Sequence, residues 1–137
     1  MIYIASRATI VERSARWRAL RDSGVPIASS WIDEAGEGET ADFTELWDRI
    51  MREIDSSSGL VLYAERDDFP LKGALIEAGI ALGMGKHVVV CLPGVEVEAR
   101  SARPIGSWIN HRLVTRCDDI HEAMLLAMRT PEGGHRG

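Results

Sequence analysis

Two short segments of this chain are apolar at nearly every position, Gly59–Ala64 and Val88–Leu92. A strand with one face in water alternates apolar and polar residues, whereas a strand of a parallel sheet is covered on both faces and reads as a continuous apolar run. A helical pattern, Gly73–Gly85, separates the two runs and is long enough for the crossover that parallel neighbours require. The two runs therefore predict a parallel sheet with helices packed on both faces.

The rest of the pattern extends this sheet to five strands. Three further strands are predicted at Met1–Ala5, Val25–Trp31 and Leu113–Arg116. Further helices are predicted at Thr9–Ser23, Phe43–Ile54 and Asp119–Arg129. Right-handed crossovers favour a small, doubly wound, flavodoxin- or Rossmann-like α/β sheet whose simplest strand order is 2-1-3-4-5. We expect residues 1–130 to form a single domain and residues 131–137 to be a disordered tail.

The charge balance limits the partners of this chain. Its 137 residues include 16 basic and 21 acidic side chains, a formal net charge of −5. A nucleic-acid polymer or an anionic membrane requires a basic face, so neither is expected as the main partner. Cys91 and Cys117 are too few for a disulfide framework or a zinc site, and Cys91 is expected to be a buried thiol. Because neither a signal peptide nor a membrane-spanning run is recognisable, we expect a cytoplasmic protein.

Glu77 is the only charged residue between Lys72 and Lys86. A helix that is apolar on nearly every side belongs to the core, where a carboxylate is costly unless it is paired or functional. The helix follows the Gly59–Ala64 strand, and ligands of parallel α/β sheets bind at the carboxyl ends of strands. A position in the first helical turns also favours the ionised carboxylate. We interpret Glu77 as a candidate nucleophile; the alternative is an ion pair with an arginine at a subunit interface.

Motifs of several other enzyme classes are missing from the sequence. The segment after the first strand lacks a dinucleotide-binding G-x-G-x-x-G, and neither a P-loop nor a G-x-S-x-G elbow occurs. The four histidines show no metal-ligand spacing. Carboxylate chemistry on a small ligand remains, in which an acid attacks an anomeric carbon and holds it as a covalent ester. Glu77 with Tyr3 meets this requirement, and no metal or organic cofactor is expected.

The chain resembles the nucleoside 2-deoxyribosyltransferase-like family, which includes relatives that hydrolyse nucleotide N-glycosidic bonds. The matching segments are Ile2–Arg7, Ser58–Tyr63 and Gly73–Val89. The last of these is similar to the family's G-x-x-x-E-x-G-x-A block, which is closed by G-K-x-V. The resemblance extends in order and spacing from Met1 to about Leu92, and its most specific part is the block around Glu77.

The resemblance implies a role for each candidate residue. Glu77 falls on the family's nucleophile position, and Tyr3 would hydrogen-bond to Glu77 and orient it. An acid of the second helix would contact the sugar or the base; Asp48 lies close to that position, and Asp55 is the alternative. The expected substrate-binding residues are Ser6, Arg7, Asp55, Asp68, Gly73 and Asn110. Asn110, with Ser107 and His111 as alternatives, would serve the site of a neighbouring subunit.

One position departs from the family. Leu71 stands where the family's transferases often carry an aspartate that is involved with the base. Transfer of the sugar to a second base and hydrolysis by water are therefore equally open.

Each candidate also has a purely structural interpretation. Tyr3 could pack beneath a helix, and Arg7 could be one more surface arginine. The acids Asp48, Asp55, Asp67 and Asp68 could be solvated helix or loop residues. We interpret Trp17 and Trp47 as core or interface anchors, and not as platforms for a base.

The resemblance implies an enzyme that cleaves the N-glycosidic bond of a 2′-deoxynucleoside or its 5′-monophosphate through a glycosyl ester on Glu77. A non-catalytic nucleotide-binding module on the same fold is the alternative. Cleavage of a dinucleotide such as NAD at its ribosyl bond ranks last, because it rests on the fold alone. We expect a homodimer or a larger homo-oligomer.

Overall fold

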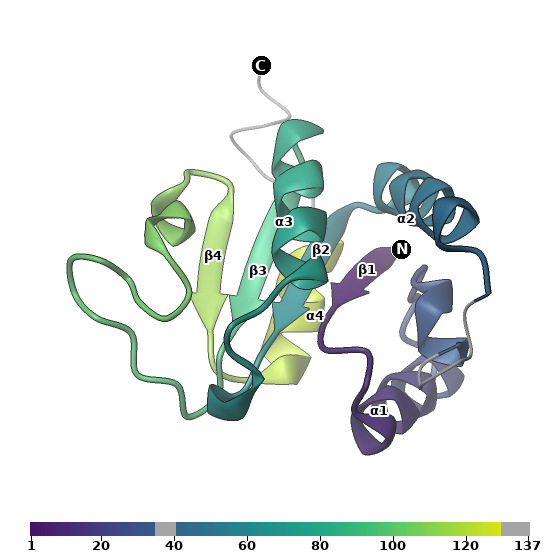
Figure 1. The fold of residues 1–137 in the computed structure, drawn as a ribbon, viewed down its shortest axis with the longest axis horizontal. Coiled ribbons are helices and arrows are strands. Elements are labelled where there is room, and N and C mark those ends of the chain that lie inside the picture. The colour runs from purple at the N-terminus through teal and green to yellow at the C-terminus, as the bar shows by residue number, and fades with distance from the viewer. Residues whose placement is uncertain (35–40, 130–137) are drawn as a thin grey trace.

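In the computed structural model, which describes residues 1–34 and 41–129, four strands form one parallel sheet (Figure 1). The strands are β1 (Ile2–Ala5), β2 (Gly59–Tyr63), β3 (His87–Cys91) and β4 (Val114–Cys117), and they neighbour one another in this order. All residues of β1 and β2 are buried. The predicted α/β class with a parallel sheet is confirmed, and burial on both faces explains the continuous apolar runs.

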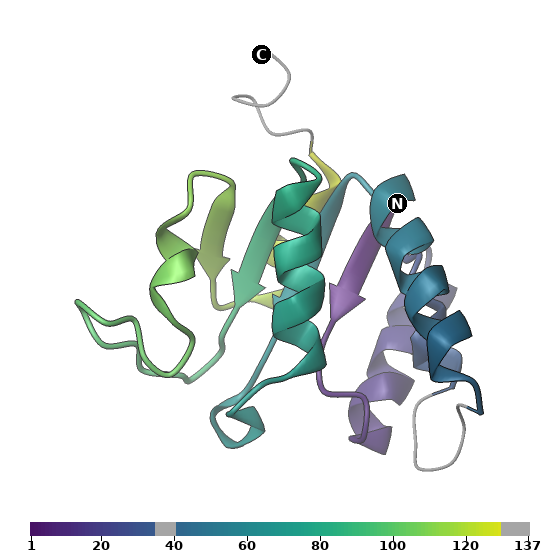
Figure 2. The same cartoon turned by 45° about the horizontal axis from the view of Figure 1, so that its top comes forward.

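Helices cover both faces of this sheet. The α-helices are α1 (Val11–Asp22), α2 (Phe43–Ser56), α3 (Gly73–Gly83) and α4 (Ile120–Met128). The short 3-10 helices are η1 (Ser30–Asp33), η2 (Arg66–Asp68) and η3 (Ser107–Asn110). Figures 1 and 2 show α2 and α3 side by side over one face and α4 on the other. The predicted stop of the first helix is confirmed, since Gly24 follows α1 with a φ of 114°.

Strand register decides which side chains lie beneath which helix. A Cβ on Gly59 would lie 2.4 Å from the carbonyl oxygen of Ala127, so this side of β2 faces α4. Side chains alternate along a strand, so Leu60 and its neighbour in register, Tyr3, face the side covered by α2 and α3. Tyr3 is thereby placed under the helix that carries Glu77.

The predicted five-stranded sheet is wrong in one element, the second strand at residues 25–31. This segment pairs with β1 only in a single bridge between Ile27 and Ile2, and the chain then turns into η1. Two side chains take the place of the missing ladder: Ser29 Oγ accepts from the N–H of Ile4 at 2.6 Å, and Trp31 Nε1 donates to the Ile4 carbonyl at 2.8 Å. The edge of β1 is satisfied without a neighbouring strand, which a count of apolar residues does not reveal.

Gly59→Ala is expected to destabilise the protein by about 1–3 kcal/mol, because the new methyl group would collide with the backbone of Ala127. Gly79→Ala in α3 is the matched control: nothing lies within 4 Å of its added Cβ, and alanine is preferred to glycine in a helix by about 1 kcal/mol. The urea midpoints of the two variants should therefore move in opposite directions. An unchanged midpoint for Gly59→Ala would mean that α4 can move away from the sheet.

Several smaller expectations also have outcomes. Cys91 is a buried free thiol, as predicted. Asp42 caps α2 by accepting the N–H of Glu45 at 3.0 Å. The predicted tail, residues 131–137, lies outside the described residues. Within residues 1–34 and 41–129, no helix combines the length and apolar character needed to cross a bilayer.

Candidate active site

A cavity of about 350 Å³ opens where β1 and β2 end. From β1 the chain passes through α1 to Ile27, which bridges Ile2 on one side of β1, whereas β2 pairs with β1 on the other side. The connections diverge at this point, and such a crevice is the usual ligand site of an open α/β sheet. The cavity therefore lies at the edge at which the sequence predicts a ligand.

The walls of this cavity divide by chain segment into a polar and an apolar set. The polar lining residues come from the loops after β1 and β2 and from α3: Ser6, Arg7, Thr9, Asp68, Lys72 and Glu77. The apolar lining residues come mainly from η1 and α2: Trp31, Leu46, Trp47, Ile50, Pro70 and Leu71. Gly73 also lines the cavity, so five of the residues proposed from the sequence meet there.

Glu77 lies in the second turn of α3, and only 9% of its surface is exposed. Among the residues that the structure describes, it takes part in no ion pair. Loss of hydration raises the pKa of its carboxyl group to about 8, although the nearby Tyr3 hydroxyl lowers it. We expected the helix position to favour the ionised form; burial outweighs that effect, so the carboxyl group is largely protonated at neutral pH.

Tyr3 is fully buried beside Glu77. The hydroxyl is close enough to Glu77 to lower the pKa of its carboxyl group, but it has no hydrogen-bond partner among the described residues. Burial raises the pKa of the phenol, and the charges of Glu77 and Glu53 raise it further. Tyr3 therefore keeps its proton and can donate a hydrogen bond to an ionised Glu77.

Glu53 of α2 lies outside the cavity lining but acts on Glu77 through its charge, and we did not identify it from the sequence. Its carboxylate raises the pKa of both Glu77 and Tyr3, and it accepts from the Ser30 N–H at 3.1 Å and the Ser30 hydroxyl at 2.6 Å. The sequence could have indicated Glu53, because it follows the buried Ile50 by three residues and so lies beside the buried face of the helix.

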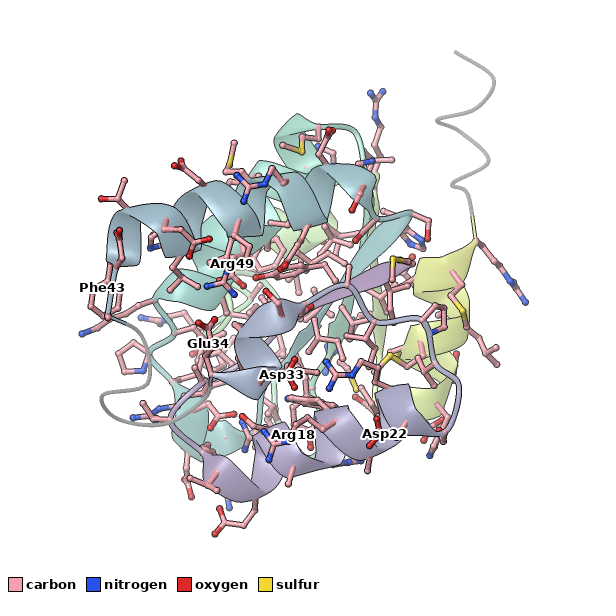
Figure 3. All side chains as sticks on the ribbon, turned by 90° about the vertical axis from the view of Figure 1, so that its right-hand side faces the viewer. Arg18, Asp22, Asp33, Glu34, Phe43 and Arg49 are labelled. Atoms are coloured by element: carbon pink, nitrogen blue, oxygen red, sulfur yellow. The ribbon has the colours of Figure 1, made fainter. Side chains whose placement is uncertain are left out.

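Arg49 connects this part of α2 to η1 and to Glu34, the residue after it. It donates to the Ser30 hydroxyl at 2.6 Å and to a carboxylate oxygen of Glu34 at 2.5 Å. Figure 3 shows Arg49 and Glu34 facing each other between α2 and the chain below it. The guanidinium also lowers the pKa of Tyr3, which opposes the effect of the two glutamates. The Tyr3 hydroxyl therefore lies in a field made by groups of α2 and α3.

The mouth of the cavity carries several hydrogen-bond donors. The Ser6 side chain is nine-tenths buried, and its hydroxyl has no partner among the described residues. Arg7 is exposed and donates to the carbonyl of Asp67 at 3.4 Å. The helix α3 begins at Gly73, directly after Lys72, and the first N–H groups of a helix lack partners within it. These groups suit an anionic part of a ligand.

Asp68 lines the cavity but is bound on its other side by Arg13. Both side chains are buried, and Arg13 donates to a carboxylate oxygen of Asp68 at 2.5 Å. The same oxygen accepts the N–H of Glu65 at 2.7 Å, and Arg13 reaches the Glu65 carboxylate at 3.2 Å. The interpretation of Asp68 as a solvated loop residue is wrong, and its contacts make it an anchor between α1 and the loop after β2.

Four residues proposed from the sequence lie outside the cavity lining: Tyr3, which is buried beside Glu77, and three exposed residues. Asp48 and Asp55 are exposed on α2, and the backbone carbonyl of Asp55 accepts from the Lys86 ammonium group at 2.7 Å. Asn110 is exposed in η3 and donates to the Ser107 carbonyl at 3.0 Å. The contact of Asn110 with a neighbouring subunit's site stays a prediction. The acid of α2 whose charge raises the pKa of Glu77 is Glu53 and not Asp48 or Asp55.

Comparison with protein-family models, with curated proteins and with solved structures gave no match to this chain. In the part of the chain that the structure describes, no three His, Cys, Asp or Glu side chains are gathered as they would be around a metal ion. The residues of the cavity therefore carry the functional argument themselves.

Proposed function

We propose that this protein cleaves the N-glycosidic bond of a nucleoside or its 5′-monophosphate, with Glu77 as the nucleophile. The observation that carries the proposal is a single carboxylate, nine-tenths buried and without an ion-pair partner among the described residues, in the wall of a ligand-sized cavity beside the protonated Tyr3. Strongly perturbed carboxyl groups in clefts are typical of catalytic sites.

In the proposed reaction, an oxygen of ionised Glu77 attacks C1′ of the sugar. The bond from C1′ to the base nitrogen breaks, and its electron pair leaves with the base. Tyr3 donates a hydrogen bond to the other carboxylate oxygen and keeps the carboxylate oriented. Water or a second base then attacks C1′ of the glycosyl ester, which frees Glu77 again.

The size of the cavity supports a ligand of one nucleoside or nucleotide. Small-molecule sites have volumes of about 300–1,000 Å³, and 350 Å³ lies near the lower limit. A dinucleotide such as NAD would fill a larger site. Two cationic donors line the cavity, Arg7 in the loop after β1 and Lys72 directly before α3, so a 5′-phosphate bound at the start of α3 would receive both charge and backbone N–H groups.

A panel of deoxynucleosides, ribonucleosides and their 5′-monophosphates tests the proposal. Each is incubated with the protein, with and without a second free base, and base release is followed by chromatography. A glycosyl adduct on Glu77, found by mass spectrometry after rapid quenching, would establish the nucleophile. Saturable binding without any base release would contradict the proposal and favour the nucleotide-binding module.

The pH dependence of kcat/KM should reveal the ionisation of Glu77. This quantity reports on the free enzyme, in which the carboxyl group has a pKa of about 8. A nucleophile must be ionised, so we expect kcat/KM to rise about tenfold per pH unit below 8 and to level off above it. A decline above pH 8 would instead make Glu77 a general acid.

Arg7→Gln and Lys72→Gln are expected to raise KM for 5′-monophosphates about 10- to 100-fold, because each removes a charged hydrogen bond. KM for the unphosphorylated nucleosides should change little. Arg100→Gln is the matched control, since Arg100 is an exposed arginine outside the cavity lining. Equal effects on phosphorylated and unphosphorylated substrates would show that these two cations do not bind phosphate.

A further inference from the structure

We propose that the apolar wall of the cavity binds the flat aromatic ring of the ligand by stacking and exclusion of water, without reading the hydrogen-bonding groups on the edge of that ring. The identification of this ring as the leaving base rests on the proposed function. Binding of the ring itself does not, so the two ideas can fail separately.

Trp31 is the fixed part of this wall. Its side chain is 7% exposed and lines the cavity. Its only polar atom, Nε1, already donates to the Ile4 carbonyl at 2.8 Å. The indole is therefore held in one orientation and offers a ligand apolar surface, but no hydrogen bond.

One face of α2 supplies the second part of the wall. Leu46, Trp47 and Ile50 are neighbours on this helix, and all three line the cavity. Trp47 is half-buried, so part of its ring is available to a ligand. Trp47 packs against the core, as predicted, and its place in the lining also makes it a surface for an aromatic ring.

The loop before α3 continues the apolar wall with two side chains. Pro70 and Leu71 line the cavity there, and Leu71 is 9% exposed. The nearest acid in that loop is Asp68, one oxygen of which is engaged by Arg13 and by the Glu65 N–H. The other polar lining groups belong to the loop after β1 and to the start of α3, on the segments that carry the proposed sugar and phosphate contacts.

The absence of edge contacts on this wall has a measurable consequence. A site that hydrogen-bonds a group of its substrate rejects an analogue without that group by about 10⁴–10⁵-fold, whereas an apolar pocket discriminates by only about 10–200-fold. A wall of this composition should therefore accept a base and an isosteric ring without polar edges almost equally. The expected substrates are then N-glycosides of aromatic rings. They include glycosides of natural bases and also glycosides whose ring is apolar or carries apolar substituents.

Binding of free rings provides a test that requires no turnover. Adenine and benzimidazole, a ring of similar shape with fewer polar edge groups, are titrated into the wild-type protein. Binding is followed by the indole N–H signals of the four tryptophans in NMR spectra. Trp→Phe variants assign the signals. We expect the Trp31 and Trp47 signals to shift, those of Trp17 and Trp108 to stay in place, and the two dissociation constants to agree within about tenfold.

Variants of Trp47 complete the test. Trp47→Ala should weaken both ligands about tenfold or more, while Trp47→Phe, which keeps an aromatic face, should retain most of the affinity. Trp108→Phe is the control outside the cavity lining. Adenine binding more than about 100-fold tighter than benzimidazole, or unchanged affinity in Trp47→Ala, would overturn the inference. Ring binding as expected, together with no cleavage of any glycoside, would instead overturn the proposed function alone.

Discussion

Glu77→Gln should abolish base release while making the folded protein more stable at alkaline pH. Glutamine has nearly the shape of glutamate, but its amide cannot form the glycosyl ester. Removing the nucleophile of a covalent mechanism commonly lowers kcat by about 10⁴-fold or more. Activity should therefore fall below detection in the chromatographic assay, and no adduct should be found at position 77.

The expected gain in stability follows from the pKa of the carboxyl group. Burial raises this pKa from 4.5 to about 8, so the folded protein holds the proton more tightly than the unfolded chain does. The protonated carboxyl group of Glu77 therefore contributes to the free energy of unfolding in full below pH 4.5, and this contribution is lost as the pH rises from about 4.5 to about 8. A pKa difference of this size corresponds to on the order of 5 kcal/mol as an upper limit, and the uncharged glutamine does not incur it.

Urea unfolding at pH 5 and pH 9 measures this effect. Glu77→Gln should resemble the wild type at pH 5 and exceed it by several kcal/mol at pH 9. Glu12→Gln, which changes an exposed glutamate of α1, should shift the midpoint little at either pH. A loss of stability in Glu77→Gln at pH 9 would mean that the carboxylate is stabilised by the fold, contrary to its burial without an ion-pair partner in the described residues.

Arg13→Met is expected to destabilise the protein by about 3–5 kcal/mol. The substitution leaves the carboxylate of Asp68 buried and without its guanidinium partner, which is the most costly way to break a buried ion pair. Methionine still fills much of the space, so the lost charge and not a cavity dominates the effect. The accompanying contact with Glu65 contributes little, since Glu65 is about half exposed.

Two comparisons separate the charge effect from lost packing. Arg13→Met combined with Asp68→Asn removes both charges and should recover part of the lost stability, because no unpaired carboxylate remains. Arg21→Met breaks the more exposed pair with Asp33 and should cost about 1 kcal/mol or less. If the double variant is as unstable as the sum of the two single variants, the two charges are not coupled.

The features that could be predicted from the sequence depend on local pattern. The strands β1, β2 and β3 are apolar at nearly every position, and the lone acid of α3 could be identified in the same way. The second strand was predicted wrongly because Ser29 and Trp31 satisfy the backbone of Ile4 with side-chain groups. A pattern of apolar residues records burial, but it does not record which group supplies a hydrogen bond.

Some site residues could likewise be predicted from local sequence pattern, and others depend on packing between distant segments. Ser6, Arg7 and Glu77 follow the ends of strands, so the topology alone predicts that they meet. Trp47 and Glu53 belong to α2, and both the place of Trp47 in the cavity lining and the effect of the Glu53 charge on Glu77 depend on how that helix packs beside α3. Arg13 is buried against Asp68, and no sequence pattern of α1 distinguishes it from the other arginines of that helix.

The sequence by itself determined the parallel α/β sheet and the isolation of Glu77 in an apolar helix, since both are written in the spacing of apolar residues along the chain. Only the tertiary structure decided the protonation of that acid. Its pKa depends on how far neighbouring elements exclude water, on the Tyr3 hydroxyl beneath α3 and on the charge of Glu53. All three effects come from segments that are far apart in the chain. Desolvation and Coulomb energies depend on distances in space and not on sequence order.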